Sequence, residues 1–110
     1  MYEKEMSIEH MEVLNIIKSL PRDEAITRKL LVAKLGTDET YYRRLNSIIN
    51  DLIVIFNEPI GSASNLYKNG YFYCRTKEDF ILAKKSLLSR IDSVGERVKA
   101  LNEIEKGDKP

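Results

Sequence analysis

The chain has 110 residues, which bounds it to one domain with room for a tail. Hydrophobic residues make up 43% and charged residues 32%, a composition that excludes a disordered or low-complexity chain. The formal net charge of +1 excludes a strongly basic protein, so any charge that serves nucleic-acid binding has to be gathered on one face.

The sequence favours a cytoplasmic protein. Its longest uncharged apolar run, Leu52–Asn57, is too short to cross a membrane, and no basic segment followed by an apolar one opens the chain. Cys74 is the only cysteine and cannot form an internal disulfide, which fits a reducing compartment. Acidic charge is concentrated in Met1–Leu20, where four glutamates outnumber two lysines, so a DNA-binding face is expected elsewhere.

The first predicted helix runs from Ile8 to about Ser19. The hydroxyl of Ser7 is suited to cap its first turn, and Pro21 prevents the helix from continuing. Apolar residues recur every three or four positions and predict a broad buried stripe, made of Ile8, Met11, Val13, Leu14, Ile16, Ile17 and Leu20.

Two closely spaced helices are predicted next, at Arg28–Leu35 and Tyr41–Ile53, after a connector with a short strand at Ala25–Ile26. Thr27 caps the first of them, and Gly36 suits the left-handed position that ends many helices. The side of this helix expected to be buried consists of Leu30, Leu31, Ala33 and Leu35.

The second of these helices has a clear amphipathic pattern. Its apolar residues follow the spacing i, i+3, i+4 and i+7 and predict a buried face made of Leu45, Ile48, Ile49 and Leu52. The opposite, polar face carries Arg43, Arg44, Ser47 and Asn50. The apolar run Ile53–Phe56 either extends this helix or begins a strand.

Two short strands, Pro59–Ser62 and Tyr71–Arg75, are predicted around the polar loop Gly61–Gly70, which contains two glycines, two serines and two asparagines. Helix, tight turn, helix and hairpin in this order are typical of a winged helix-turn-helix, an α+β fold. The second helix of that motif most often enters the major groove of DNA.

A long helix is predicted from Lys77 to about Glu105, with Thr76 and Asp79 as a capping box. Apolar residues follow each other at spacings of four and three, as in a short coiled coil, and are expected to form a dimer seam made of Leu87, Ile91, Val94, Val98 and Leu101. The alternative is one helix that packs across its own domain. We therefore divide the chain into a winged-helix domain, residues 1–76, and a C-terminal helix with a frayed tail, residues 77–110.

The residues that carry catalysis or bind metal ions are too sparse to predict an enzyme. The single histidine, His10, lies on an acidic helix and is expected at the surface, and Cys74 is expected to be a small core residue rather than a reactive thiol. No metal-ligand spacing and no glycine-rich phosphate loop occur, so neither a metal nor another cofactor is expected.

Double-stranded DNA is the expected partner. Arginine can bind guanine at two points, and hydroxyl and amide groups can contact phosphates. The residues predicted to contact DNA are Thr40, Tyr41, Tyr42, Arg43, Arg44 and Ser47 around the second helix, Arg28 and Lys29 before it, and Asn65, Lys68 and Asn69 at the hairpin tip. The alternatives are a solvated helix face with ion pairs to Glu39 or Asp51, and an ordinary polar loop tip.

Several segments, in this order, resemble small winged-helix proteins of bacteriophages and mobile elements in Gram-positive bacteria. They are Leu45–Leu52, Pro59–Ser62, Gly70–Phe72, Thr76–Asp79 and Arg97–Leu101. The resemblance implies a protein that binds DNA sites of mobile elements, either to regulate transcription or to assist replication. The chain departs from that pattern in its apolar helix exit, Leu52–Phe56, and in its long turn, Gly36–Thr40.

The sequence thus predicts a homodimer that presents two helices to a two-fold DNA site, with half-sites about one helical turn apart. The alternative is a protein-interaction module that docks on a host or phage protein without DNA. It is favoured by the near-neutral charge, the apolar Leu52–Phe56 run and the exposed heptads.

Overall fold

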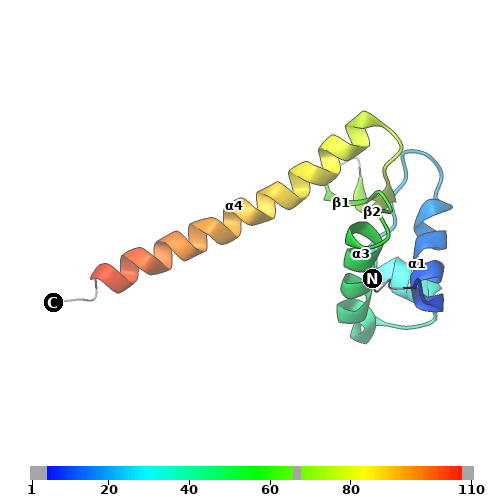
Figure 1. Cartoon of the computed structure of the whole chain (residues 1–110), viewed down its shortest axis with the longest axis horizontal. Helices are drawn as coiled ribbons and strands as arrows, with labels where there is room; N and C mark the ends of the chain where they lie inside the picture. The colour runs from blue at the N-terminus through cyan, green and yellow to red at the C-terminus, as the bar shows by residue number, and fades with distance from the viewer. Residues whose placement is uncertain (1–4, 66–67, 108–110) are drawn as a thin grey trace.

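The structure is a computed structural model that describes residues 5–65 and 68–107, with the backbone alone for residues 92–94 and 107. Within these residues, four α-helices, one 3₁₀ turn and a two-stranded antiparallel sheet follow each other (Figure 1). They are α1 (Ile8–Lys18), α2 (Arg28–Lys34), η1 (Glu39–Tyr41), α3 (Tyr42–Val54), β1 (Ile60–Ser64), β2 (Asn69–Tyr73) and α4 (Lys77–Gly107). The predicted α+β class is confirmed.

The helix ends follow the predicted local signals. The Ser7 hydroxyl accepts a hydrogen bond from the His10 amide at 3.3 Å, and the Thr27 hydroxyl accepts one from the Leu30 amide at 3.2 Å. Gly36 adopts the predicted left-handed conformation after α2, with φ of 79°. The capping box of α4 is also present, because Thr76 and Asp79 each accept a hydrogen bond from the other's backbone amide.

The main core lies between α1, α2, α3 and the hairpin, and α3 buries the face that its pattern predicted, Leu45, Ile48, Ile49 and Leu52. The run Ile53–Phe56 extends α3 to Val54 instead of beginning a strand. Its side chains are only partly covered, because Ile53, Val54 and Ile55 are 36%, 66% and 43% exposed.

The buried side of α2 differs from the prediction. Leu31 and Val32 are buried, whereas Leu30 and Ala33 are exposed and Leu35 is half-buried. This helix has only seven residues, so its short pattern fixes the buried face poorly. Leu31 and Val32 therefore enter the core, and the half-buried Leu35 packs against it.

The prediction of a surface His10 is wrong. The residue is 3% exposed, and its Nε2 lies 2.9 Å from Oδ2 of Asp51 on α3. Its Nδ1 lies 2.5 Å from the Ser7 hydroxyl, and the ring packs edge-on against Phe56. Both ring nitrogens have partners, which is the condition for burying a polar side chain without a large cost.

The hairpin is longer than predicted. Strands β1 and β2 pair from Ile60 opposite Tyr73 to Ser64 opposite Asn69, so both strands extend into the predicted loop. Beyond that last pair, the Asn65 amide donates a hydrogen bond to the Lys68 carbonyl oxygen, and the Lys68 amide donates one to Oδ1 of the Asn65 side chain. The second strand also ends earlier than predicted, at Tyr73.

The short strand predicted at Ala25–Ile26 is present as a single bridge. Ile26 and Tyr71 exchange two backbone hydrogen bonds of 2.8 Å. Gly70, with φ of 117°, permits this approach, because an added Cβ would lie 2.2 Å from the carbonyl oxygen of Ile26. The segment before α2 is thereby fastened to the hairpin.

The long helix α4 packs on the hairpin only through its first turns. Ala83 of α4 lies over Gly61 of β1 and forms a second buried cluster with Ala63, Phe72 and Cys74. Beyond these turns α4 extends away from the rest of the molecule (Figure 1). With this helix included, the longest dimension of the molecule is 58 Å. Contacts with the hairpin therefore stabilise the first turns of α4 and do not cover the rest of this helix.

Replacing Gly61 with alanine is expected to loosen this contact. An added Cβ would lie 2.6 Å from the Ala83 Cβ and 2.7 Å from the Phe72 ring, and overpacking of this kind lowers the free energy of unfolding by about 1–3 kcal/mol. Gly95 of α4 has open space around it and serves as the control; Gly95→Ala is expected to raise stability by about 0.5–1 kcal/mol. Urea denaturation measures both, and an equal effect of the two substitutions would contradict the close contact.

Candidate nucleic-acid interface

The exposed face of α3 is polar and lies beside the hairpin and α4. Arg43, Ser47 and Asn50 follow the spacing i, i+4 and i+7 and share one side of the helix, with Asn46 next to them. All four are exposed, and Arg43 has no ion pair within the described part of the chain. This face offers one guanidinium, two amides and one hydroxyl to a partner.

Arg44 points to the other side of α3, toward α1. Its guanidinium forms an ion pair with Glu9 at 2.9 Å, and the Tyr41 hydroxyl donates a hydrogen bond to the same carboxylate. These contacts with Arg44 and Tyr41 hold the pKa of Glu9 at about 2, below its ordinary 4.5. Arg44 and Tyr41, both predicted to contact DNA, thus join α3 to α1. The ion pair of Arg44 is with Glu9 and not with Glu39 or Asp51, the alternative partners that the sequence offered.

The lowered pKa of Glu9 predicts a defined dependence of stability on pH. A carboxylate with a depressed pKa in the folded state stabilises the protein above its unfolded pKa, and this contribution disappears as the pH falls from about 4.5 to about 2. The difference in unfolding free energy between the wild type and Glu9→Gln is therefore expected to be full at pH 6 and to shrink over that range.

Thermal unfolding at several pH values measures this difference for Glu9. Glu12→Gln, on the exposed part of the same helix, is the control and is expected to show a smaller dependence over the same range. A pH-independent difference for Glu9→Gln would contradict the ion pair with Arg44.

Thr40 and Tyr42 have structural contacts at the start of α3. The Thr40 hydroxyl and amide both donate to the Asp38 carboxylate, and these hydrogen bonds lower the pKa of Asp38. The Tyr42 ring supports Arg28 of α2, whose guanidinium lies 4.0 Å from the ring centroid. Arg28 is thereby held in place beside the hairpin, and Lys29 next to it is exposed.

The three residues predicted at the hairpin tip differ in their availability. The Lys68 ammonium lies 3.3 Å from the Asp79 carboxylate and 4.4 Å from the Phe72 ring centroid, and the Lys68 side chain is only 12% exposed. Asn65 and Asn69 are exposed. The side chain of Lys68 therefore joins the hairpin to α4, and the Asn65 side chain accepts a hydrogen bond from the Lys68 amide. Asn69 is the exposed tip residue that can offer its amide to a partner.

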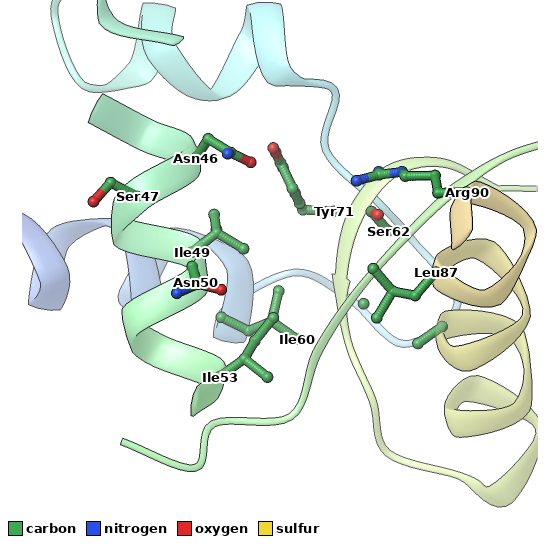
Figure 2. A pocket seen from close by; sticks show the side chains of 12 residues that line it. Asn46, Ser47, Ile49, Asn50, Ile53, Ile60, Ser62, Tyr71, Leu87 and Arg90 are labelled. Atoms are coloured by element: carbon green, nitrogen blue, oxygen red, sulfur yellow. The ribbon is translucent and has the colours of Figure 1, made fainter. Parts of the chain in front are cut away.

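Three hollows lie around the hairpin and share Ser62 and Arg90. The first, of about 430 Å³, is bounded by α3, the hairpin and α4, and Figure 2 shows Asn46 and Asn50 on one wall with Leu87 and Arg90 on the other. The second, of about 470 Å³, lies between β1 and α4. The third, of about 330 Å³, lies between β2 and the start of α2.

The linings of these three hollows have a consistent chemistry. Within the described residues they contain no aspartate or glutamate. They contain four cationic side chains, Arg28, Lys29, Lys85 and Arg90. We call this surface, together with Ser62 and Tyr71, the basic face. Its charge is gathered on one side although the whole chain is almost neutral.

Sequence reasoning missed Asn46, Lys85 and Arg90. The position of Asn46 beside the polar face of α3 follows from helical spacing and was available from the sequence. Lys85 and Arg90 belong to the helix that was assigned to dimerisation, and only the crossing of α4 over β1 brings them to the hairpin.

The residues of the predicted dimer seam are exposed to different degrees, and the seam itself stays a prediction. Ile91, Val98 and Leu101 are 64%, 54% and 64% exposed, whereas the side chain of Val94 lies outside the described residues. Leu87 is half exposed but lines the first hollow opposite α3. The stripe available to another helix therefore begins at Ile91.

The described residues contain no group of three metal-ligating side chains, and Cys74 is buried, which raises the pKa of its thiol. No helix in the described part of the chain has the length and apolar character needed to cross a membrane. No protein-family model, curated protein or solved structure matches this chain.

Proposed function

We propose that this chain is a winged helix-turn-helix protein that binds double-stranded DNA with sequence specificity. Its role would be that of a phage-type transcriptional regulator or replication accessory protein in the cytoplasm. The observation that carries the proposal is the exposed polar face of α3, which opens onto a basic face without carboxylates.

The order of the elements supports the fold assignment. Helices α2 and α3, joined through η1, correspond to the helix-turn-helix, and the β1–β2 hairpin corresponds to the wing. The bridge between Ile26 and Tyr71 fastens the segment before α2 to that wing. In this arrangement α3 is the recognition helix.

The side chains on α3 match the chemistry of base edges. Arg43 can donate two hydrogen bonds to guanine, and the amides of Asn46 and Asn50 can pair with adenine. Ser47, one turn after Arg43, suits a contact with the DNA backbone. Arg44 supports this face indirectly, because its ion pair with Glu9 fixes α3 against α1.

A homodimer is part of the proposal. The exposed apolar stripe on the projecting part of α4 continues the four-and-three spacing of a coiled coil. Pairing of this stripe with a second copy would cover it and place two recognition helices on a two-fold DNA site.

Substitutions on α3 test the assignment of the recognition helix. Arg43→Ala and Asn50→Ala are each expected to reduce discrimination for the preferred site by about 1–3 kcal/mol. The control is Arg22→Ala, which removes an exposed arginine outside α3 and the basic face. Fluorescence anisotropy measures the affinities, and binding by the α3 variants that equals that of Arg22→Ala at every salt concentration would refute the assignment.

A protein-interaction module remains the second candidate function because of one specific feature. The exposed side chains of Ile53, Val54 and Ile55 lie together at the end of α3 and would suit an apolar partner. Salt separates the two functions, because phosphate-driven binding weakens steeply as salt increases, whereas apolar docking does not.

A further inference from the structure

We propose that the first turns of α4 belong to the DNA-binding surface, with Arg90, Arg28 and Lys29 holding one stretch of the phosphate backbone over the wing. This inference rests on the proposed DNA-binding function and adds a helix to the surface that carries it. The ligand class is the phosphodiester backbone of a duplex, which these residues would bind without reading its bases.

The position of Arg90 is the first argument. It lines all three hollows around the hairpin, and Figure 2 shows its side chain extending from α4 toward Tyr71. Burial raises the pKa of Tyr71, and the charges of Arg28 and Arg90 oppose that rise. The guanidiniums of Arg28 and Arg90 therefore both lie near Tyr71 of the hairpin, although Arg28 belongs to α2 and Arg90 to α4.

The availability of these cations is the second argument. In the part of the chain that the structure describes, Arg28, Lys29 and Arg90 form no ion pair, whereas Arg44 and Lys68 are neutralised by Glu9 and Asp79. Arg28 is held by the Tyr42 ring, so its guanidinium is already placed before a ligand arrives.

The surrounding groups suit a phosphate. Ser62, Tyr71 and Asn69 line the third hollow and supply hydroxyl and amide donors between the cations. No carboxylate lines this hollow, so a phosphate oxygen would meet donors alone. Arg90 stands on the wall opposite α3, which places it beside the backbone rather than at the base edges that α3 would contact.

The test compares Arg90→Ala with Arg90→Lys and Lys84→Ala in the full-length protein. Lys84 is an exposed cation of α4 that lines none of the three hollows, so its removal changes the net charge equally. Anisotropy titrations use the preferred duplex and a scrambled duplex over a range of salt concentrations. Circular dichroism of each variant confirms that α4 remains helical.

Arg90→Ala is expected to weaken binding to both duplexes by the same factor, about tenfold at low salt. The salt slope is expected to fall by about 0.9 for each subunit that contacts DNA. Arg90→Lys keeps most of the slope because the charge remains, and Lys84→Ala keeps both affinity and slope.

Two results would overturn the inference, and they are distinguishable. If the wild type binds DNA and Arg90→Ala behaves like Lys84→Ala, α4 has no role in the interface while the proposed function stands. If the wild type binds neither duplex at low salt, the proposed function itself fails and the inference fails with it.

Discussion

Replacing Ile91 and Val98 together with aspartate is expected to convert the protein from dimers to monomers. Both side chains are more than half exposed on the projecting part of α4, and pairing would enclose two carboxylates in an apolar seam. Because the proposed dimer would hold a two-fold site with two linked recognition helices, the monomer is expected to bind that site about 10²–10⁴-fold more weakly. Analytical ultracentrifugation measures the mass, and anisotropy measures the affinity.

The control for this prediction reverses charges on the opposite side of the same helix. Glu96→Lys with Glu103→Lys changes two exposed residues outside the apolar stripe and the basic face, and its mass is expected to equal that of the wild type. An unchanged mass for the Ile91 and Val98 variant would show that α4 does not pair through this stripe.

Replacing His10 with alanine is expected to lower the free energy of unfolding by about 2–4 kcal/mol, because a buried ring is removed from the core together with its hydrogen bonds. The substitution removes a ring that is 3% exposed and takes from the Asp51 carboxylate a partner at 2.9 Å. It also removes the contact between α1 and Phe56 at the end of α3.

A double-mutant cycle with Asp51→Ala isolates the contribution of this contact. The two single substitutions are expected to cost more in sum than the double substitution, because each single substitution already removes the contact between the two side chains. Glu12→Ala, on the exposed side of α1, should stay within about 0.5 kcal/mol of the wild type. A loss for His10→Ala no larger than that of Glu12→Ala would contradict the role of the buried contact.

Local patterns predicted the bounds of the helices well, because capping residues and helix breakers act within a few positions of the ends that they set. They predicted the buried faces less evenly, since Ile8 and Met11 of α1 and Leu30 of α2 are exposed. The spacing of Leu45, Ile48, Ile49 and Leu52 defined the buried face of α3, and the capping box placed the start of α4. The length of the hairpin was predicted less well, because the strands pair as far as Ser64 opposite Asn69. Polar residues such as Ser64 are not typical of strands.

The burial of His10 follows from helical spacing, because His10, Val13, Leu14 and Ile17 lie at i, i+3, i+4 and i+7 and form the buried face of α1. Its partner could not be predicted in this way, because Asp51 lies 41 positions later in the chain. Only the packing of α1 against α3 brings the two side chains together. The same packing pairs Arg44 with Glu9, whereas Arg43 forms no ion pair among the described residues, a difference between adjacent arginines that the sequence does not reveal.

The candidate site shows the same division. The exposure of Arg43 and Ser47 followed from the amphipathic pattern of α3. Arg90 lies in α4, for which the heptad spacing predicted helix pairing and no contact with DNA. Its place in the basic face depends on the contact between Gly61 and Ala83, which sets where α4 crosses the hairpin. Such a crossing is a tertiary property, and no local spacing encodes it.

The most direct test of the central claim is fluorescence anisotropy of the purified protein against a randomised duplex pool at two salt concentrations, followed by sequencing of the bound fraction. Binding that weakens as salt rises, with enrichment of a roughly palindromic site, is the expected result for a dimeric winged-helix protein. The absence of binding at low salt would contradict the account and favour docking on another protein through the exposed apolar residues.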